Sequence, residues 1–186
     1  MLLVGVAAHH FDQAVVALEA AGVHVVDPVV GPQLRHTFGV AGVDAWGVGA
    51  EDPQDRQLVL GGTRSGKSVH AESLAAATGT DVVYVATARR DSGDEEMSAR
   101  IAAHRDRRPA SWVTVETDEV ARVLSEYPAS TVLVDDLGGW LTRRMDATLA
   151  WTDGGAAVAD ELDAVVAAVA ERAAPVVLVS PEVGLG

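Results

Sequence analysis

Eight consecutive residues, 61–68, match the pattern G-x-x-x-x-G-K-[ST], which binds nucleotide phosphates. Glycines let the backbone turn so that successive N–H groups face phosphate oxygens, and the N-terminus of the following helix adds partial positive charge. A glycine-rich turn without a ligand is the alternative, but the apolar run before the motif and the helical pattern after it favour a P-loop. The predicted nucleotide-binding residues are Gly61, Gly62, Thr63, Arg64, Ser65, Gly66, Lys67 and Ser68.

An acidic residue that could hold a metal ends a second, mostly apolar run, residues 131–135. A carboxylate at the end of a buried strand is the usual partner of a P-loop for Mg²⁺, and Asp135 is the first choice for this role. Asp136 directly follows and is the second choice. An Asp in this place is often a strand end or a helix cap, so the interpretation depends on the P-loop. We therefore expect Ser68 and Asp135 to bind Mg²⁺ and Lys67 to act in catalysis on the β- and γ-phosphates.

A basic cluster lies between these two motifs. Arg100 and His104 are four residues apart, which places them on one face of a helix, and Arg105, Arg107 and Arg108 follow. In a chain this acidic, the cluster suggests an anion-binding site, and a neutral imidazole can attack a phosphorus atom. From the residues alone, however, a solvent-exposed helix face is the more common explanation of such a pattern.

The elements that must position these residues alternate from residue 57 onward between short β-branched runs and helical stretches. This is the pattern of parallel strands joined by crossover helices, so the predicted fold class is α/β with a mostly parallel sheet. Strands are expected at residues 57–60, 81–86, 112–116, 131–135 and 175–180. Helices are expected directly after the P-loop and at residues 95–105, 118–126 and 156–173.

The first 56 residues differ in character from the rest. A strand is expected at residues 1–7, an amphipathic helix at 11–21 and a strand at 23–26, followed by a segment rich in Gly and Pro. The sequence thus predicts a short βαβ-like N-terminal extension with a linker, residues 1–56, ahead of a P-loop domain, residues 57–186. His9 and His10 are expected to form a surface pair, and we assign no metal site to them.

Composition limits the classes of function. Fourteen Lys and Arg against 27 Asp and Glu leave a formal charge of -13, which would repel nucleic acid. The sequence has no Cys, which rules out disulfides and fits a reducing compartment. No apolar run approaches the roughly 20 residues that span a bilayer, and the N-terminal residues lack the positive charge of a secretory signal. We expect a cytoplasmic protein with neither a nucleic-acid partner nor a membrane span.

Five segments of the sequence resemble, in order and spacing, the adenosylcobinamide kinase/adenosylcobinamide-phosphate guanylyltransferase family. They are LVLGGTRSGKSVHAESL, VVYVATA, DEEMSARIAAHRDRRPASWVTVET, VLVDDLGGWLT and VVLVSPEVGLG. The R-I-x-x-H-x-x-R-R-P-x-x-W and E-V-G-x-G blocks are more specific than a P-loop. The resemblance covers residues 57–186 and implies a RecA-like P-loop domain, usually assembled as a homotrimer, that acts in cobalamin biosynthesis.

The resemblance also implies two reactions. In the first, ATP or GTP phosphorylates adenosylcobinamide. In the second, His104 attacks GTP, holds GMP as a phosphoramidate and passes it to adenosylcobinamide phosphate, which gives adenosylcobinamide-GDP. His104 is thus implied to be catalytic. The nucleotide contacts implied outside the P-loop are Ala86, Thr87, Ala88, Arg105, Asp106, Arg107, Arg108, Glu116 and Asp135.

The sequence departs from the family pattern at several positions. Residues 136–139 read Asp-Leu-Gly-Gly where the family usually has Cys-Leu-Thr-Leu, while Arg143 and Pro181 each replace an Asn. Family members continue past the last motif with a further helix and strand, so we expect a C-terminally incomplete domain. Some members carry a hydrolase-like domain ahead of the kinase, of which residues 1–56 could be a remnant. Two alternatives stay open: a P-loop small-molecule kinase or NTPase without guanylylation, and a non-catalytic, truncated nucleotide-binding module.

Overall fold

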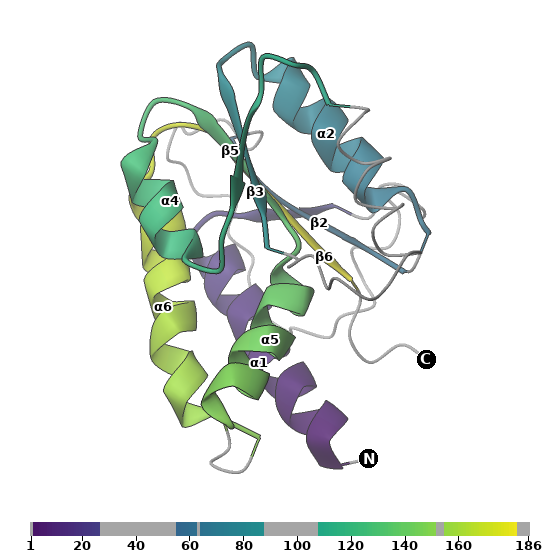
Figure 1. Ribbon diagram of the computed structural model, residues 1–186, viewed down its shortest axis with the longest axis vertical. Helices are drawn as coiled ribbons and strands as arrows, with labels where there is room; N and C mark the ends of the chain where they lie inside the picture. The colour runs from purple at the N-terminus through teal and green to yellow at the C-terminus, as the bar shows by residue number, and fades with distance from the viewer. Residues whose placement is uncertain (1, 27–54, 63, 88–107, 152–154, 182–186) are drawn as a thin grey trace.

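The structure is a computed structural model that describes residues 2–26, 55–62, 64–87, 108–151 and 155–181. Its centre is a six-stranded sheet with neighbours in the order β1-β2-β6-β5-β3-β4 (Figure 1). Every pair of neighbouring strands is parallel, so the carboxyl ends of all these strands lie at one edge of the sheet. Open α/β sheets bind their ligands at this edge. The strands are β1 (His24–Val26), β2 (Arg56–Gly61), β3 (Val82–Ala86), β4 (Val113–Glu116), β5 (Thr131–Asp135) and β6 (Val176–Pro181).

Helices cover both faces of the sheet (Figure 1). Within the described ranges, one face packs against α2 and the other against α1, α4, α5 and α6. Successive strand residues point to opposite faces, so Tyr84 packs on the side of α2 while Val83 and Val85 pack on the other side. No helix in the described part of the chain is long and apolar enough to cross a lipid bilayer. The helices are α1 (Leu2–Ala20), α2 (Lys67–Ala77), α4 (Val120–Glu126), α5 (Leu137–Thr148) and α6 (Ala156–Glu171).

The predicted α/β fold class is confirmed. The five strands expected from residue 57 onward are present, each with boundaries within one residue of the prediction. The helix expected after the P-loop is α2, and those expected at residues 118–126 and 156–173 are α4 and α6, each two residues shorter than predicted at one end. The helix expected at residues 95–105 lies outside the described residues.

The helix α5 is missing from the predicted elements because its first turn contains Gly138 and Gly139, which are poor helix formers. Asp136 offsets this weakness as N-cap, since its carboxylate accepts a hydrogen bond from the Gly139 N–H at 2.5 Å. Apolar residues at helical spacing then hold α5 against the sheet. Its buried residues are Leu137, Gly138, Trp140, Leu141 and Met145.

The strand predicted at residues 1–7 is wrong, because α1 is helical from Leu2 to Ala20. Periodicity cannot distinguish a short apolar strand from a buried helix segment, and here the apolar run continues the helix predicted at residues 11–21. The strand predicted at residues 23–26 is present as β1, which pairs with β2 in the same sheet. Helix α1 packs against α5 and α6, and the division of the chain after residue 56 stays a prediction.

Arg172 binds the C-terminal end of α4. Its side chain is 6% exposed, and its guanidinium donates to the carbonyl oxygens of Leu124, of Tyr127 at 2.9 Å and of Ser130 at 2.6 Å. The last carbonyls of a helix lack partners within the helix and form the negative end of its dipole, so a cation is favourable there. Arg56 donates in turn to the carbonyl oxygen of Arg172 at 2.6 Å. Burial lowers the pKa of Arg172 from its ordinary value.

Candidate active site

The predicted P-loop connects β2 to α2 at the carboxyl edge of the sheet. Gly66 precedes the helix with φ 84° and ψ 5°, a left-handed conformation that glycine adopts without steric cost. No side chain among the described residues caps this N-terminus, so the N–H groups of the first turn need another acceptor. An anion bound here would accept those hydrogen bonds and meet the positive end of the helix dipole.

Two contacts within the loop involve the carbonyl oxygen of Gly62. The Lys67 ammonium donates to it at 3.2 Å, which holds this positive charge at the loop. The Ser65 N–H donates to the same oxygen at 3.3 Å. A Cβ at Gly61 would lie 2.5 Å from Ser65 Oγ, so a larger residue at position 61 would require Ser65 to move.

Asp135 and Ser68 come together across the sheet edge. Asp135 Oδ1, at the end of β5, lies 3.5 Å from Ser68 Oγ in α2, the helix that follows β2, although β6 separates β5 from β2 in the sheet. Two oxygens that share one Mg²⁺ at about 2.1 Å each can be no more than about 4 Å apart, so this pair fits the ion. No group of three or more His, Cys, Asp or Glu suited to a metal occurs among the described residues. Mg²⁺ does not require one, because it usually keeps waters and binds substrate phosphates beside one or two protein oxygens.

Tyr84 occupies the second oxygen of the same carboxylate. Its hydroxyl donates to Asp135 Oδ2 at 2.6 Å, and its side chain is buried against the α2 face. Burial and the neighbouring Asp135 raise the pKa of Tyr84 above its ordinary value, so the hydroxyl keeps its proton. The guanidinium carbon of Arg108 lies 3.2 Å from the centre of the Tyr84 ring. This stacking connects the end of the basic cluster to the acidic residue at the P-loop.

The Asp136 carboxylate binds the start of α5, where it accepts a hydrogen bond from the Gly139 N–H. The peptide bond that joins it to Asp135 is cis. Its backbone N–H donates to Thr87 Oγ1 at 3.0 Å, and the Thr87 hydroxyl donates to the Asp136 carbonyl oxygen at 2.9 Å. Burial raises the pKa of the Asp136 carboxyl, while the Gly139 N–H, Arg143 and Lys67 act in the opposite direction. Asp136 is therefore a helix cap in this structure, and Asp135 has the geometry expected of the metal ligand.

Some of the remaining predicted site residues are described by the structure, and the others lie outside the described part of the chain. Ala86 lies opposite both Asp135 and Glu116 in the strand register, so these three positions share the carboxyl edge with the P-loop. Arg64, with φ 61°, is exposed on the loop. The predicted residues outside the described part of the chain are Thr63, Ala88, His104, Arg105, Asp106 and Arg107.

Comparison with known proteins identifies the family of this site. A family model described as cobinamide kinase / cobinamide phosphate guanyltransferase matches residues 57–186. The chain belongs to this family. It is 45% identical over 134 residues to the bifunctional adenosylcobalamin biosynthesis protein CobP of Pseudomonas aeruginosa, which covers 70% of this chain and 73% of the relative. Its identity to the CobU proteins of Salmonella typhimurium and Escherichia coli is 36% and 38%, over 69% of this chain and 76% of each relative. The resemblance seen in the sequence segments is thus confirmed.

Two of the positions at which departures from the family pattern were expected from the sequence, Gly138 and Pro181, lie close together in this member of the cobinamide kinase family. A Cβ at Gly138 would lie 2.8 Å from both Cδ and Cγ of Pro181 and 3.0 Å from Ser180 Oγ. The proline ring therefore fills the space that a side chain at position 138 would need. A Cβ at Gly139 would similarly lie 2.9 Å from Asp136 Oδ1 and 3.1 Å from a terminal nitrogen of Arg143. The space beside Gly138 is thus filled by Pro181, and that beside Gly139 by Asp136 and Arg143.

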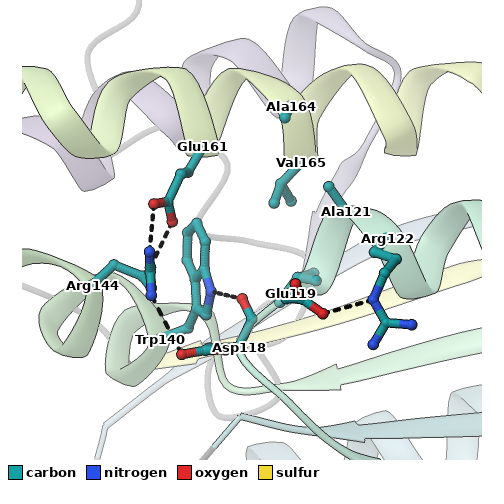
Figure 2. Close-up of a pocket in the computed structure, with 10 residues that line it drawn as sticks. Asp118, Glu119, Ala121, Arg122, Trp140, Arg144, Glu161, Ala164 and Val165 are labelled. Carbon is teal, nitrogen blue, oxygen red and sulfur yellow. Dashed lines mark hydrogen bonds and ion pairs between the residues drawn. The ribbon is translucent and has the colours of Figure 1, made fainter. Parts of the chain in front are cut away.

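A cavity of about 380 Å³ lies between α4, α5 and α6, on the face of the sheet opposite α2 (Figure 2). The Arg144 guanidinium lies between Glu161, with two contacts of 2.6 Å, and Asp118 at 3.4 Å. Trp140 forms part of the wall and donates its indole N–H to the Asp118 carbonyl oxygen at 2.7 Å. These charged groups satisfy one another, and the lining includes none of the predicted nucleotide-binding residues that the structure describes.

Tyr84 is the site residue that the sequence did not reveal. It stands in the apolar segment VVYVATA, where a tyrosine is expected to serve as core. One signal was present, since a buried tyrosine hydroxyl needs a hydrogen-bond partner. Naming that partner requires the strand order, which places β3 beside β5 and aligns Tyr84 with Leu133, two residues before Asp135.

Proposed function

We propose that this chain phosphorylates adenosylcobinamide with ATP or GTP and then transfers GMP from GTP to the product, which gives adenosylcobinamide-GDP in cobalamin biosynthesis. The observation that carries the proposal is the pairing of Ser68 with Asp135 at an uncapped P-loop helix, inside the segment that matches the family. The similar proteins of three bacteria are named as bifunctional adenosylcobalamin biosynthesis proteins.

In the kinase step, the hydroxyl of the aminopropanol arm of adenosylcobinamide attacks the γ-phosphorus, and the nucleoside diphosphate leaves. Lys67 and the N–H groups at the start of α2 bind the phosphates and stabilise the charge on the transferred group. Ser68 and Asp135 would hold Mg²⁺, whose charge would offset that of the phosphates. Lys67 acts in both reactions, because each requires a bound triphosphate.

In the guanylyl step, a neutral His104 attacks the α-phosphorus of GTP and pyrophosphate leaves, so that GMP is held through a P–N bond. A phosphate oxygen of adenosylcobinamide phosphate then attacks the same phosphorus and releases His104. The residues proposed to contact the nucleotide beside the P-loop are Ala86, Thr87, Ala88, Arg105, Asp106, Arg107, Arg108, Glu116 and Asp135. The Thr87 hydroxyl is engaged with Asp136 and the Thr87 N–H donates to the Asp135 carbonyl oxygen, so we assign any contact by Thr87 to its own carbonyl oxygen.

Assembly and location are part of the same proposal. We infer a homotrimer that acts in the cytoplasm, without nucleic-acid partners. The net charge of -13 supports the exclusion of nucleic acid. Light scattering coupled to size exclusion tests the trimer, and a monomeric mass at micromolar concentration would contradict it.

The decisive experiment is incubation with GTP labelled at the α-phosphate, followed by denaturation and measurement of protein-bound label. We expect acid-labile label on the wild-type chain and none on His104→Ala. The matched control is His24→Ala, since His24 is exposed on the edge strand β1. If His104→Ala retains label at the wild-type level, the covalent step at this residue is wrong. If no chain is labelled but ATP is turned over, a P-loop kinase or NTPase without guanylylation is the correct alternative; binding without turnover indicates a non-catalytic module.

A further inference from the structure

The hydroxyl of Tyr84 has no part in the two reactions above, yet it makes a short contact in the site. Its 2.6 Å hydrogen bond to Asp135 Oδ2 joins a neutral donor to a carboxylate, a class of hydrogen bond that is shorter and stronger than one between neutral groups. The tyrosine is 2% exposed, so water does not compete for the contact. A buried hydroxyl directed at a candidate metal ligand therefore requires an explanation beyond core packing.

The sheet register explains why the contact forms. Tyr84 lies opposite Leu133 on the neighbouring strand β5, and Asp135 is two residues further along, on the same face of the sheet. The phenol thus reaches along the sheet toward its carboxyl edge. With Oδ2 bound by Tyr84, Oδ1 is the oxygen that lies 3.5 Å from Ser68 Oγ.

We propose that Tyr84 is a positioning residue that fixes the orientation of the Asp135 carboxylate, so that Oδ1 is presented with Ser68 Oγ to a divalent cation. This inference rests on the proposed function, in which Ser68 and Asp135 bind Mg²⁺. Groups that hydrogen-bond to metal ligands set the orientation of those ligands, and their loss typically lowers metal affinity or activity by about 10- to 100-fold.

The ring of Tyr84 also contacts the basic cluster, at Arg108. Arg108 stacks on the ring at 3.2 Å, so the ring fixes a guanidinium as the hydroxyl fixes a carboxylate. The two contacts can be separated by substitution. Tyr84→Phe keeps the ring under Arg108 and removes the hydrogen bond, whereas Tyr84→Leu removes both. Tyr84→Phe should therefore weaken metal binding alone, and Tyr84→Leu should also weaken GTP binding measured without metal.

The test is a titration of the full chain with Mn²⁺ in the presence of a non-hydrolysable GTP analogue, with free Mn²⁺ followed by electron paramagnetic resonance. We expect Tyr84→Phe to raise the Mn²⁺ dissociation constant about tenfold. A second readout is the Mg²⁺ concentration for half-maximal kinase activity, which should rise while the rate at saturating Mg²⁺ stays near that of the wild type. A purely structural role for Tyr84 would not produce this split.

Tyr127→Phe is the matched control, because Tyr127 is the other of the two tyrosines in the sequence. Asp135→Asn separates the proposed metal site from the proposed positioning role of Tyr84. If Asp135→Asn weakens Mn²⁺ binding and Tyr84→Phe binds like the wild type, the positioning role is wrong and the metal site stands. If Asp135→Asn also binds like the wild type, the metal site itself is wrong. Should Tyr84→Phe fail to fold, wild-type Mn²⁺ affinity in a folded Tyr84→Leu variant would overturn the proposal.

Discussion

The two faces of the sheet differ in what their residues are used for. The face packed against α2 has a small buried cluster, and near the carboxyl edge it carries Ser68, Tyr84 and Asp135. The opposite face is covered by α1, α4, α5 and α6 and holds most of the buried apolar residues in the described part of the chain. The difference indicates that stability comes mainly from the face covered by four helices, here called the thick side, while the proposed chemistry lies on the face covered by α2, here called the thin side. Substitutions on the two sides should therefore separate stability from activity.

The strongest test on the thick side is Trp140→Ala. Trp140 is 2% exposed and its indole N–H donates to the Asp118 carbonyl oxygen, so truncation leaves a cavity and removes this hydrogen bond. We expect the free energy of unfolding to fall by about 3–5 kcal/mol, measured by urea denaturation. Trp151→Ala, at a partly exposed tryptophan, should cost less. Equal losses for the two variants would contradict the assignment of Trp140 to the main core.

On the thin side, Lys67→Ala should act in the opposite way. A charge-assisted contact between Lys67 and phosphate is worth about 1.5–3 kcal/mol, so kcat/KM for both reactions should fall by about 10- to 100-fold. The urea midpoint should hardly change, because the ammonium's protein contact is a single exposed hydrogen bond to Gly62 among the described residues. Unchanged kinetics in a folded Lys67→Ala variant would refute the P-loop assignment.

Arg172→Met tests whether a buried polar residue on the thick side also contributes to stability. The variant keeps an apolar side chain of similar length but strips the carbonyls of Leu124, Tyr127 and Ser130 of their common donor. Loss of hydrogen bonds to a charged group should lower the free energy of unfolding by about 1.5–3 kcal/mol. Arg122→Met is the control, since Arg122 makes exposed ion pairs with Glu119 and Glu126. A similar urea midpoint for both arginine variants would argue against the capping role.

The smallest loss of stability is expected at Gly138, in the first turn of α5 beside the end of β6. A methyl group there would press on the Pro181 ring, so Gly138→Ala should destabilise the chain by about 1 kcal/mol. Pro181→Ala removes the ring and should relieve most of this cost, which a double-mutant cycle in urea would detect. Additive effects of the two substitutions would show that the two positions do not interact.

The sequence predicted the fold class well because five strands are apolar runs with clear ends, such as TVLVD in β5. It failed at residues 1–7 because an apolar run of that length fits a strand or a helix equally well. In the site, the P-loop motif and an acidic residue at the end of an apolar run led to the prediction of Ser68 and Asp135, whose Oγ and Oδ1 atoms lie 3.5 Å apart; their role as metal ligands stays a prediction. Tyr84 was not predicted, because its contact depends on which strands are neighbours, and strand order is a property of the whole sheet.

Lys67, whose ammonium group lies at the Gly62 carbonyl oxygen, is the single lysine of the sequence. Reagents that acylate amines can therefore react with one side chain and with the α-amino group. The extent of acylation at Lys67 would report directly how much of the loop is occupied by a nucleotide. The same feature affects the choice of method, because coupling the protein to a sensor surface through its lysine would attach it by the loop under study. Binding measurements on this protein should anchor it through a different group.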